Sequence, residues 1–415
     1  MALSASSLRA KQEPPTLLLN REGEDIVSTS GENPECGYPH LKNEFEEDTS
    51  KRTNFISIQQ SHVVAAEGYQ VCPVRTGYEN VLAHRTNALF SYVAKAPGVI
   101  SAISSEHVVI TYDDPELPND RVQIGRRYGV VTGRTVPHTL VCDLAEGTRV
   151  DAGHVVVFNS GFFARDVLQP TQVVWKAGIL SKVVIQDSPD TLEDSCAISP
   201  RLASAMTITT CEVREISVRF TDHVRNLVNV GESVTSTSTV CTIEDSDIIN
   251  DKLLDSSSDA LRLLSRNAPS AKYDGVVTKI DIIYNGDPED MTDTLRTLVA
   301  DADRNRNRLV KKLRNGDATT GEVSDLNPDT AVIKIYIESK LGMGDGDKGV
   351  FGNQLKTVVR RVVQGKFETE DGTPLDAIFG YTSINDRIVL SPTLIGTATT
   401  VMRLITRRFI ENYRK

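Results

Sequence analysis

The sequence lacks any apolar run that approaches the length of a membrane-spanning helix, and its opening stretch, MALSASSLRAKQEPP, lacks the apolar core of a signal peptide. Its six cysteines form no Cys-x-x-Cys pair, and its seven histidines show no spacing typical of metal ligands. These absences predict a cytosolic chain with no membrane segment, in which reduced thiols fill core positions and each histidine has a structural role. A disulfide framework and a zinc site are both disfavoured.

Several binding motifs are also missing in their usual forms. A Walker phosphate loop needs Gly-Lys-Ser/Thr at the start of a helix, whereas residues 346–349 read Gly-Asp-Lys-Gly after a strand pattern. A calcium loop that began at Asp345 would need a glutamate at its twelfth position, which is Lys356. Residues 147–157, GTRVDAGHVVV, fit a barrel-sandwich domain such as a biotin or lipoyl carrier. No convincing lysine lies at a hairpin tip between two such strands, so a carrier function is disfavoured.

What the sequence does contain is the composition of a soluble globular protein. Its 415 residues, of which 25% are charged and 6% aromatic, are enough for about two or three domains. The net charge of −10 argues against binding of nucleic acid over the whole surface, but it allows a locally basic channel. Short β-like runs between Gly and Pro turns predict a β-rich, mixed α/β protein.

Two segments have clear helical patterns. The first is expected over Met291–Arg314, whose basic second half is either a solvated face or a contact for nucleic acid or an acidic partner. The second lies near the C-terminus, where Met402, Ile405 and Phe409 share one face.

The most informative stretch is Ala331–Phe351, AVIKIYIESKLGMGDGDKGVF. It begins with alternating Ile and polar residues, the pattern of a half-buried strand. It then breaks into a loop, Lys340–Gly349, which has four glycines among its ten residues and contains the two lysines Lys340 and Lys348. Two ammonium groups held by a strand and a glycine-rich turn suit phosphate oxygens. A plain Asp-Gly surface turn is the alternative explanation of the loop taken alone.

Two other stretches could complete a phosphate site. Glu193 and Asp194, in TLEDSCAIS, are adjacent carboxylates able to hold a magnesium ion brought in by phosphates, although Asp-Ser before a strand is usually a turn or cap. Arg387 follows DGTPLDAIF, an expected turn and strand. Its fork of N–H donors suits a triphosphate, and a surface salt bridge is the alternative.

Taken in order, these stretches resemble the β subunit of multisubunit DNA-directed RNA polymerases. IKIYIESKLGMGDGDKGV is similar to the family's strand and Lys-Met-Ala-Gly-Arg-His-Gly-Asn-Lys-Gly-Val loop, LEDSCAISPRL to its Glu-Asp-Ala-Ile-Val-Ile-Ser-Glu-Arg-Leu motif, and DGTPLDAIF to its Asp-Gly-Thr-Pro-Val-Asp-Ile-Val segment. The resemblance implies that Lys340 and Lys348 contact phosphates at the growing RNA end. It also implies that Arg387 meets the triphosphate of the incoming nucleotide, and that Asp194 and Glu193 lie near the second Mg²⁺, directly or through water.

The likeness runs from about residue 55 to residue 400, with departures. The family's Arg-His inside the lysine loop is Gly344-Asp345 here, and the Gln-Arg-Gln of its fork region reads Gln60-Ser61-His62. The three catalytic aspartates lie on β′ in the family, so the main Mg²⁺ ligands are expected on a β′-like partner chain. The lobe, the protrusion and the last β segment have no counterpart. The chain therefore resembles the catalytic part of the split β subunits of giant tailed bacteriophages, in an infected bacterial cytoplasm or in the virion.

The implied fold is a double-psi β barrel with barrel-sandwich-like elements and a flap-like insertion. The implied activity is nucleotidyl transfer within a complex that includes an N-terminal β part, β′-like chains, DNA template, RNA and nucleoside triphosphates; the chain is expected to be inactive alone. A non-catalytic assembly or structural protein that retains a polymerase β fold is the competing interpretation. The expected domains are a partner-dependent extension (1–54), first barrel and hybrid segments with the acidic motif (55–211), the flap-like insertion (212–328), a second barrel segment with the lysine and arginine loops (329–390), and a basic helix (391–415).

Overall fold

The computed structural model describes residues 16–22, 64–75, 78–131, 134–245, 267–310, 327–352, 355–370, 372–382 and 391–414. Strands account for 44% and helices for 17%, which confirms the predicted β-rich, mixed α/β class. None of the sheets formed by the described residues closes into a barrel. Among the described helices, none combines the length and apolar character needed to cross a membrane.

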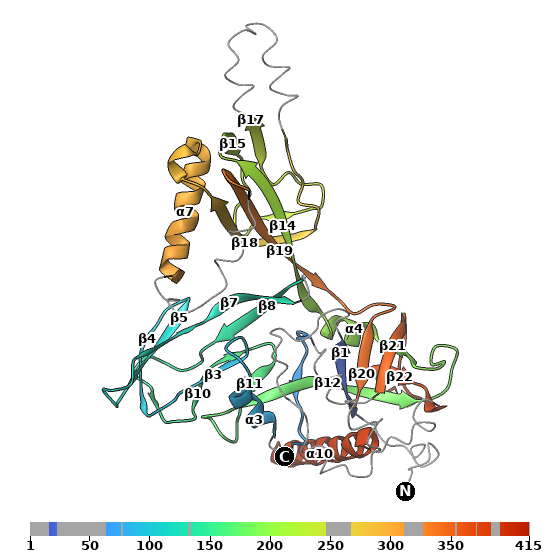
Figure 1. Ribbon diagram of the computed structural model, residues 1–415. Helices are drawn as coiled ribbons and strands as arrows, with labels where there is room; N and C mark the ends of the chain where they lie inside the picture. The colour runs from blue at the N-terminus through green and yellow to red at the C-terminus, as the bar shows by residue number, and fades with distance from the viewer. Residues whose placement is uncertain are drawn as a thin grey trace. The chain divides into compact units, whose positions relative to one another are not determined.

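The chain divides into two compact units (Figure 1). Unit 1 consists of Met1–Ile208 and Leu341–Lys415, and unit 2 consists of Thr209–Lys340. Unit 2 is therefore inserted between the two segments of unit 1. The finer domain boundaries expected from the sequence stay a prediction.

The principal sheet of unit 1 has eight strands in the order β1–β20–β21–β13–β22–β12–β11, with β2 beside β12. Its pairs β12–β22 and β13–β21 are parallel, and the other pairs are antiparallel. The strands are β1 (Thr16–Glu22), β2 (Gln70–Val71), β11 (Phe163–Arg165), β12 (Val173–Ile185), β13 (Ser195–Ile198), β20 (Lys348–Phe351), β21 (Leu355–Val362) and β22 (Ala377–Phe379).

One face of this sheet is covered by a hydrophobic core. In β21 the side chains of Leu355, Thr357 and Val359 are buried while the intervening residues are half-buried or exposed, as expected for a strand with one covered face. Phe351 of β20 and Phe379 of β22 are both fully buried in this core, with ring centroids 5.3 Å apart. The core thus joins the strand after the lysine loop to the strand after Asp-Gly-Thr-Pro.

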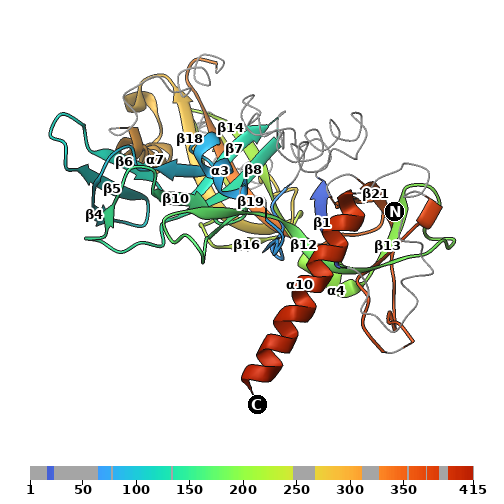
Figure 2. The same ribbon diagram turned by 90° about the horizontal axis from the view of Figure 1, so that it is seen from below.

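Among the described residues, two smaller sheets and three helices complete unit 1. One sheet has the order β3–β10–β8–β7 within this unit, and the other has the order β6–β5–β4–β9. Figure 2 shows α10 extending past β1 with its C-terminal half projecting from unit 1. The elements are α3 (Tyr78–Arg85), β3 (Ser91–Val93), β4 (Gly98–Ile103), β5 (His107–Tyr112), β6 (Asp120–Gln123), β7 (Gly125–Val131), β8 (Arg134–Val141), β9 (Arg149–Val150), β10 (Val155–Asn159), α4 (Pro200–Ala205) and α10 (Ser391–Tyr413).

The described residues of unit 2 form a sheet in the order β16–β18–β19–β14, a separate β15–β17 pair and the long helix α7. Ile333, Ile335 and Ile337 of β19 are at most 1% exposed, which confirms the predicted strand face. Buried side chains of α7 complete the same core. The elements are β14 (Ile208–Arg219), β15 (Asp222–Arg225), β16 (Ser233–Val234), β17 (Thr242–Asp245), β18 (Gly275–Asn285), the 3₁₀ helix η2 (Pro288–Asp290), α7 (Asp293–Val310) and β19 (Thr330–Leu341).

Candidate functional site

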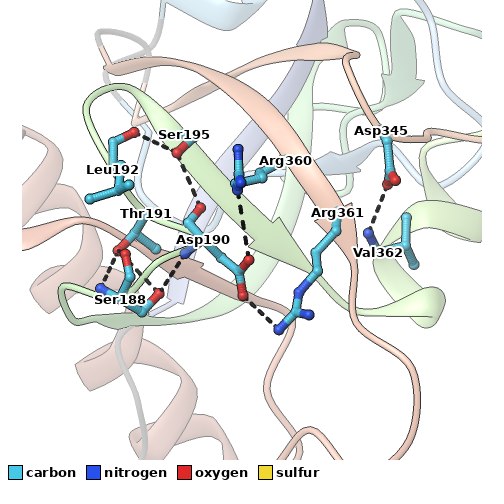
Figure 3. Close-up of polar contacts among 9 residues, drawn as sticks. All are labelled: Ser188, Asp190, Thr191, Leu192, Ser195, Asp345, Arg360, Arg361 and Val362. Atoms are coloured by element: carbon cyan, nitrogen blue, oxygen red, sulfur yellow. Dashed lines mark hydrogen bonds and ion pairs between the residues drawn. The ribbon is translucent and has the colours of Figure 1, made fainter.

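The predicted acidic pair belongs to a tight turn between β12 and β13 that local side chains hold in shape (Figure 3). The Thr191 hydroxyl accepts the Ser188 N–H at 2.7 Å, and the Ser195 hydroxyl donates to the Asp190 carbonyl at 3.1 Å. Such Ser and Thr contacts with nearby backbone are the usual way a turn of this kind is stabilised. Within it Glu193 has φ of 54°, a conformation that costs a residue with a Cβ about 1–2 kcal/mol.

The acidic turn is bonded directly to β21. Asp194 is half-buried, Glu193 is exposed, and the Asp194 carbonyl accepts the Val358 N–H at 2.9 Å. Ser195, which follows the pair, lies opposite Val358 in the parallel β13–β21 register. The two carboxylates therefore lie at the start of β13, beside the middle of β21.

The lysine loop is bonded to the same strand. The Gly346 N–H donates to the Val359 carbonyl at 2.7 Å, and the Val359 N–H donates to the Asp347 carbonyl at 2.8 Å. Further along β21, the Val362 N–H donates to the Asp345 carboxylate at 3.0 Å (Figure 3). The loop thus follows β21 closely and does not extend freely into solvent, which distinguishes it from the plain surface turn considered above.

Glycine is required at one position of this loop and optional at another. Gly346 has φ of 90°, which a residue with a Cβ rarely adopts. Gly344 has no positive φ, and a Cβ built there would meet nothing within 4 Å. The position that resembles the family's arginine therefore has room for a side chain.

β21 lies between Lys348 and the acidic pair. Lys348 is opposite Val358 on the β20 side, and Ser195 is opposite Val358 on the β13 side. Two strand spacings separate the backbones of Lys348 and Ser195, which amounts to about 10 Å. Lys340 is exposed and is the last residue of unit 2, so of the two predicted lysines only Lys348 belongs to the sheet that carries the acidic turn.

The segment after Asp-Gly-Thr-Pro adjoins the acidic strand on its other edge. In the β13–β22 register Cys196 is opposite Phe379. Asp376, which is 1% exposed, accepts the Lys182 N–H at 2.7 Å and forms an ion pair with Arg201 of α4. This contact fixes the start of β22 against β12 and α4.

Arg387, the predicted triphosphate ligand, lies outside the described residues. The described chain ends before it at Thr382, whose hydroxyl donates to the Asp187 carboxylate at 3.0 Å. Asp187 immediately precedes the turn that holds the acidic pair. Thr382, the last described residue before Arg387, is thus bonded beside that turn.

A charged cluster that local sequence patterns do not indicate lies beside these segments. The Asp190 carboxylate lies 2.6 Å from a terminal guanidinium nitrogen of Arg361 and 3.9 Å from Nε of Arg360 (Figure 3). Both arginines are on β21, and both side chains are more than half exposed. The Arg-Arg pair that begins eleven residues after the loop's Asp-Lys-Gly was the available signal, but nothing in the nearby sequence indicates that the strict alternation of the strand ends there.

The buried Cys196 thiol beside the acidic pair is unsuited to nucleophilic catalysis. Burial raises the pKa of the Cys196 thiol to about 11, so this thiol, at the start of β13, is protonated near neutral pH. Within the described ranges, no group of three or more His, Cys, Asp and Glu side chains is gathered as a metal site. The acidic pair thus offers two carboxylates, a ligand set that suits Mg²⁺ bound together with phosphates.

Comparisons with known proteins do not identify this chain. No model of a known protein family matches it, and no curated protein sequence matches it. Any assignment of function therefore depends on the motifs and on the geometry described above.

Proposed function

We propose that this chain is a subunit of a multisubunit DNA-directed RNA polymerase and supplies the β side of the nucleotidyl-transfer site. In this proposal Lys340 and Lys348 bind phosphates at the RNA 3′ end, and Arg387 binds the triphosphate of the incoming nucleotide. Nucleotidyl transfer depends mostly on positioning and on stabilising charge around the phosphates, which suits a set of cations on a rigid scaffold.

One observation supports the proposal most strongly. The three motifs of the resemblance are far apart in sequence, yet their strands are neighbours in one sheet, in the order β20–β21–β13–β22. The lysine loop and the acidic turn even bond to consecutive residues of β21, Val359 and Val358. Unrelated surface turns have no physical reason to converge in this way.

The acidic pair fits a role near a magnesium ion. Glu193 is exposed on a turn with a strained backbone, and such strain is often found at functional sites. Asp194, beside it, is half-buried and bonded through its carbonyl to β21. Magnesium bound with a triphosphate would neutralise phosphate charge, and Glu193 and Asp194 would orient it directly or through water.

The proposal includes the finer features of the fold and the partners. The strands that carry the motifs would belong to a double-psi β barrel with barrel-sandwich-like elements, and the flap-like insertion, residues 212–328, would lie within unit 2. Because two carboxylates do not complete a two-metal site, β′-like chains would supply the principal magnesium ligands. An N-terminal β part, the DNA template and the RNA product would complete the complex.

The test is nucleotide addition by the complex purified from its native source through a tag on this chain. Lys348→Ala should lower the rate by about 10²-fold, because a charge that acts on phosphates in a partly desolvated site contributes roughly 2–4 kcal/mol to the transition state. Lys366→Ala is the matched control, since Lys366 is an exposed lysine beyond β21 that pairs with Glu368. Normal RNA extension by the Lys348→Ala complex would refute the assignment.

A second candidate is a non-catalytic assembly protein that retains the fold. Asp345 favours this candidate, because it replaces the family's histidine and so lowers the positive charge of the loop. Its carboxylate accepts a backbone N–H of β21. Purification of the tagged chain distinguishes the candidates. Nucleotide addition by co-purified chains supports the polymerase, whereas an assembled complex with no such activity supports the structural protein.

A further inference from the structure

The turn that carries the acidic pair is attached to the neighbouring segments at three points. At its start, the Asp187 carboxylate accepts the N–H of Thr382 at 3.2 Å and the hydroxyl of the same residue at 3.0 Å. At its end, the Asp194 carbonyl accepts a backbone N–H of β21 at 2.9 Å. Between these two points, the Asp190 carboxylate forms an ion pair with Arg361 of β21 at 2.6 Å. The middle of the turn is therefore attached through side chains alone.

Arg361 faces the turn because the alternation of β21 is interrupted. Thr357 and Val359 are 1% exposed and point into the core, so strict alternation would bury the side chain at position 361 as well. The register with β13 shifts at this point, since β13 pairs with Val359 and then with Arg361, which leaves Arg360 as an extra residue. A bulge of this kind re-aims the side chains that follow it, and such bulges are common beside functional sites. Arg361 is accordingly 58% exposed and points toward the turn (Figure 3).

Both carboxylate oxygens of Asp190 face an arginine. Oδ2 lies 2.6 Å from the Arg361 guanidinium, and Oδ1 lies 3.9 Å from Nε of Arg360. The backbone of Asp190 belongs to the hydrogen-bond network inside the turn, because its N–H donates to the Ser188 hydroxyl at 3.2 Å and its carbonyl accepts the Ser195 hydroxyl at 3.1 Å. Asp190 thus connects the internal network of the turn to β21.

We propose that Asp190 is a positioning residue, whose ion pair with Arg361 holds the turn so that Glu193 and Asp194 can orient a magnesium ion bound with phosphates. The magnesium role rests on the function proposed above. Four carboxylates lie within the eight residues Asp187–Asp194, and their mutual repulsion opposes a compact turn. Groups that hold metal-ligating segments in place typically contribute about 10- to 100-fold to metal affinity. An ion pair with a largely exposed arginine contributes little to global stability, so its role should be visible in local order and in metal dependence.

Amide hydrogen exchange of the full chain tests whether the pair holds the turn. Asp190→Asn removes the charge and keeps the shape of the side chain. The reporting amides are those of Thr191 and Ser195, which donate within the turn, and that of Val358, which donates to the Asp194 carbonyl. Their exchange should become about two to five times faster, the change expected for the loss of an exposed ion pair.

The Arg225–Glu244 ion pair of unit 2 provides a matched control. Its side chains are 57% and 24% exposed, close to the 58% and 21% of Arg361 and Asp190. Glu244→Gln should therefore have a similarly small effect on the thermal transition of the chain. It should leave exchange in the acidic turn at the wild-type rate.

The magnesium dependence of nucleotide addition by the native complex tests the positioning role. Asp190→Asn should need about tenfold more Mg²⁺ for half-maximal rate and should approach the wild-type rate at saturating Mg²⁺. Glu244→Gln should need the wild-type concentration. The double variant Asp190→Asn/Arg361→Gln should need no more Mg²⁺ than Asp190→Asn alone, because both changes remove the same contact.

The outcomes separate this inference from the proposed function. Wild-type exchange in Asp190→Asn would overturn the inference, because the pair would then not hold the turn. Faster exchange with an unchanged Mg²⁺ requirement would also overturn it, since the pair would then be structural only. Additive effects of Asp190→Asn and Arg361→Gln would show that the two residues do not act through one contact. If the wild-type complex adds no nucleotides, the proposed function fails and the magnesium role fails with it, whereas the exchange rates still show whether the pair holds the turn.

Discussion

A pair of glycine substitutions tests whether the lysine loop is held in one conformation along β21. Gly346 and Gly344 lie two residues apart, and a Cβ at either position meets nothing within 4 Å. They differ in the backbone, because only Gly346 has a positive φ, 90°. Gly346→Ala should therefore destabilise the loop by about 1–2 kcal/mol through backbone strain alone. Gly344→Ala should be neutral or stabilising by up to about 1 kcal/mol, since it reduces the freedom of the unfolded chain.

Amide hydrogen exchange of the full chain measures this difference locally. The reporting amides are those of Gly346, Val359 and Val362, which donate the hydrogen bonds between the loop and β21. A loss of 1–2 kcal/mol corresponds to exchange that is roughly 5–30 times faster in Gly346→Ala, with wild-type exchange in Gly344→Ala. Equal exchange in the two variants would refute the reasoning, because the loop would then not depend on the left-handed backbone at Gly346.

Two further predictions concern the scaffold of unit 1. Burial, with a contribution from the nearby charge of Arg126, lowers the pKa of His138 from 6.5 to about 4. Because the unfolded chain then binds the proton more tightly, stability should fall by roughly 3 kcal/mol as the pH drops from 6.5 to 4. His138→Gln should flatten this part of the urea-denaturation profile, and an unchanged profile would contradict the prediction. Asp376→Ala should destabilise unit 1 by about 2–4 kcal/mol in the same assay, because it leaves the Lys182 N–H and Arg201 without their acceptor. Arg201→Lys should cost less than about 1 kcal/mol, since this side chain is 69% exposed.

The sequence alone was sufficient for features that depend on local periodicity. The alternating isoleucines around Ile335 predicted a strand with one buried face, and β19 has that face. The helix expected over Met291–Arg314 corresponds to α7, which the structure describes as far as Val310. In each case the burial pattern repeats within one element, so the sequence of that element carries the information.

Features that depend on pairing between distant segments could not be read from periodicity. Ser195 and Val358 are neighbours across β13 and β21, yet nothing in either segment specifies the other. The bulge at Arg360 arises from a mismatch between these two strands, so a sequence window on β21 contains no sign of it. Only the resemblance, which orders the motifs in one family, suggested that they would meet. Arg387 lies outside the described residues, so its role stays a prediction.

The departure of the lysine loop from the resemblance has a physical explanation in this sheet. Asp345 uses its carboxylate to accept the Val362 N–H, which closes the loop against β21, while Gly344 carries no side chain toward the open side. Where the family has Arg-His, this chain has Gly-Asp, so a cation is replaced by a carboxylate that bonds to the backbone of β21.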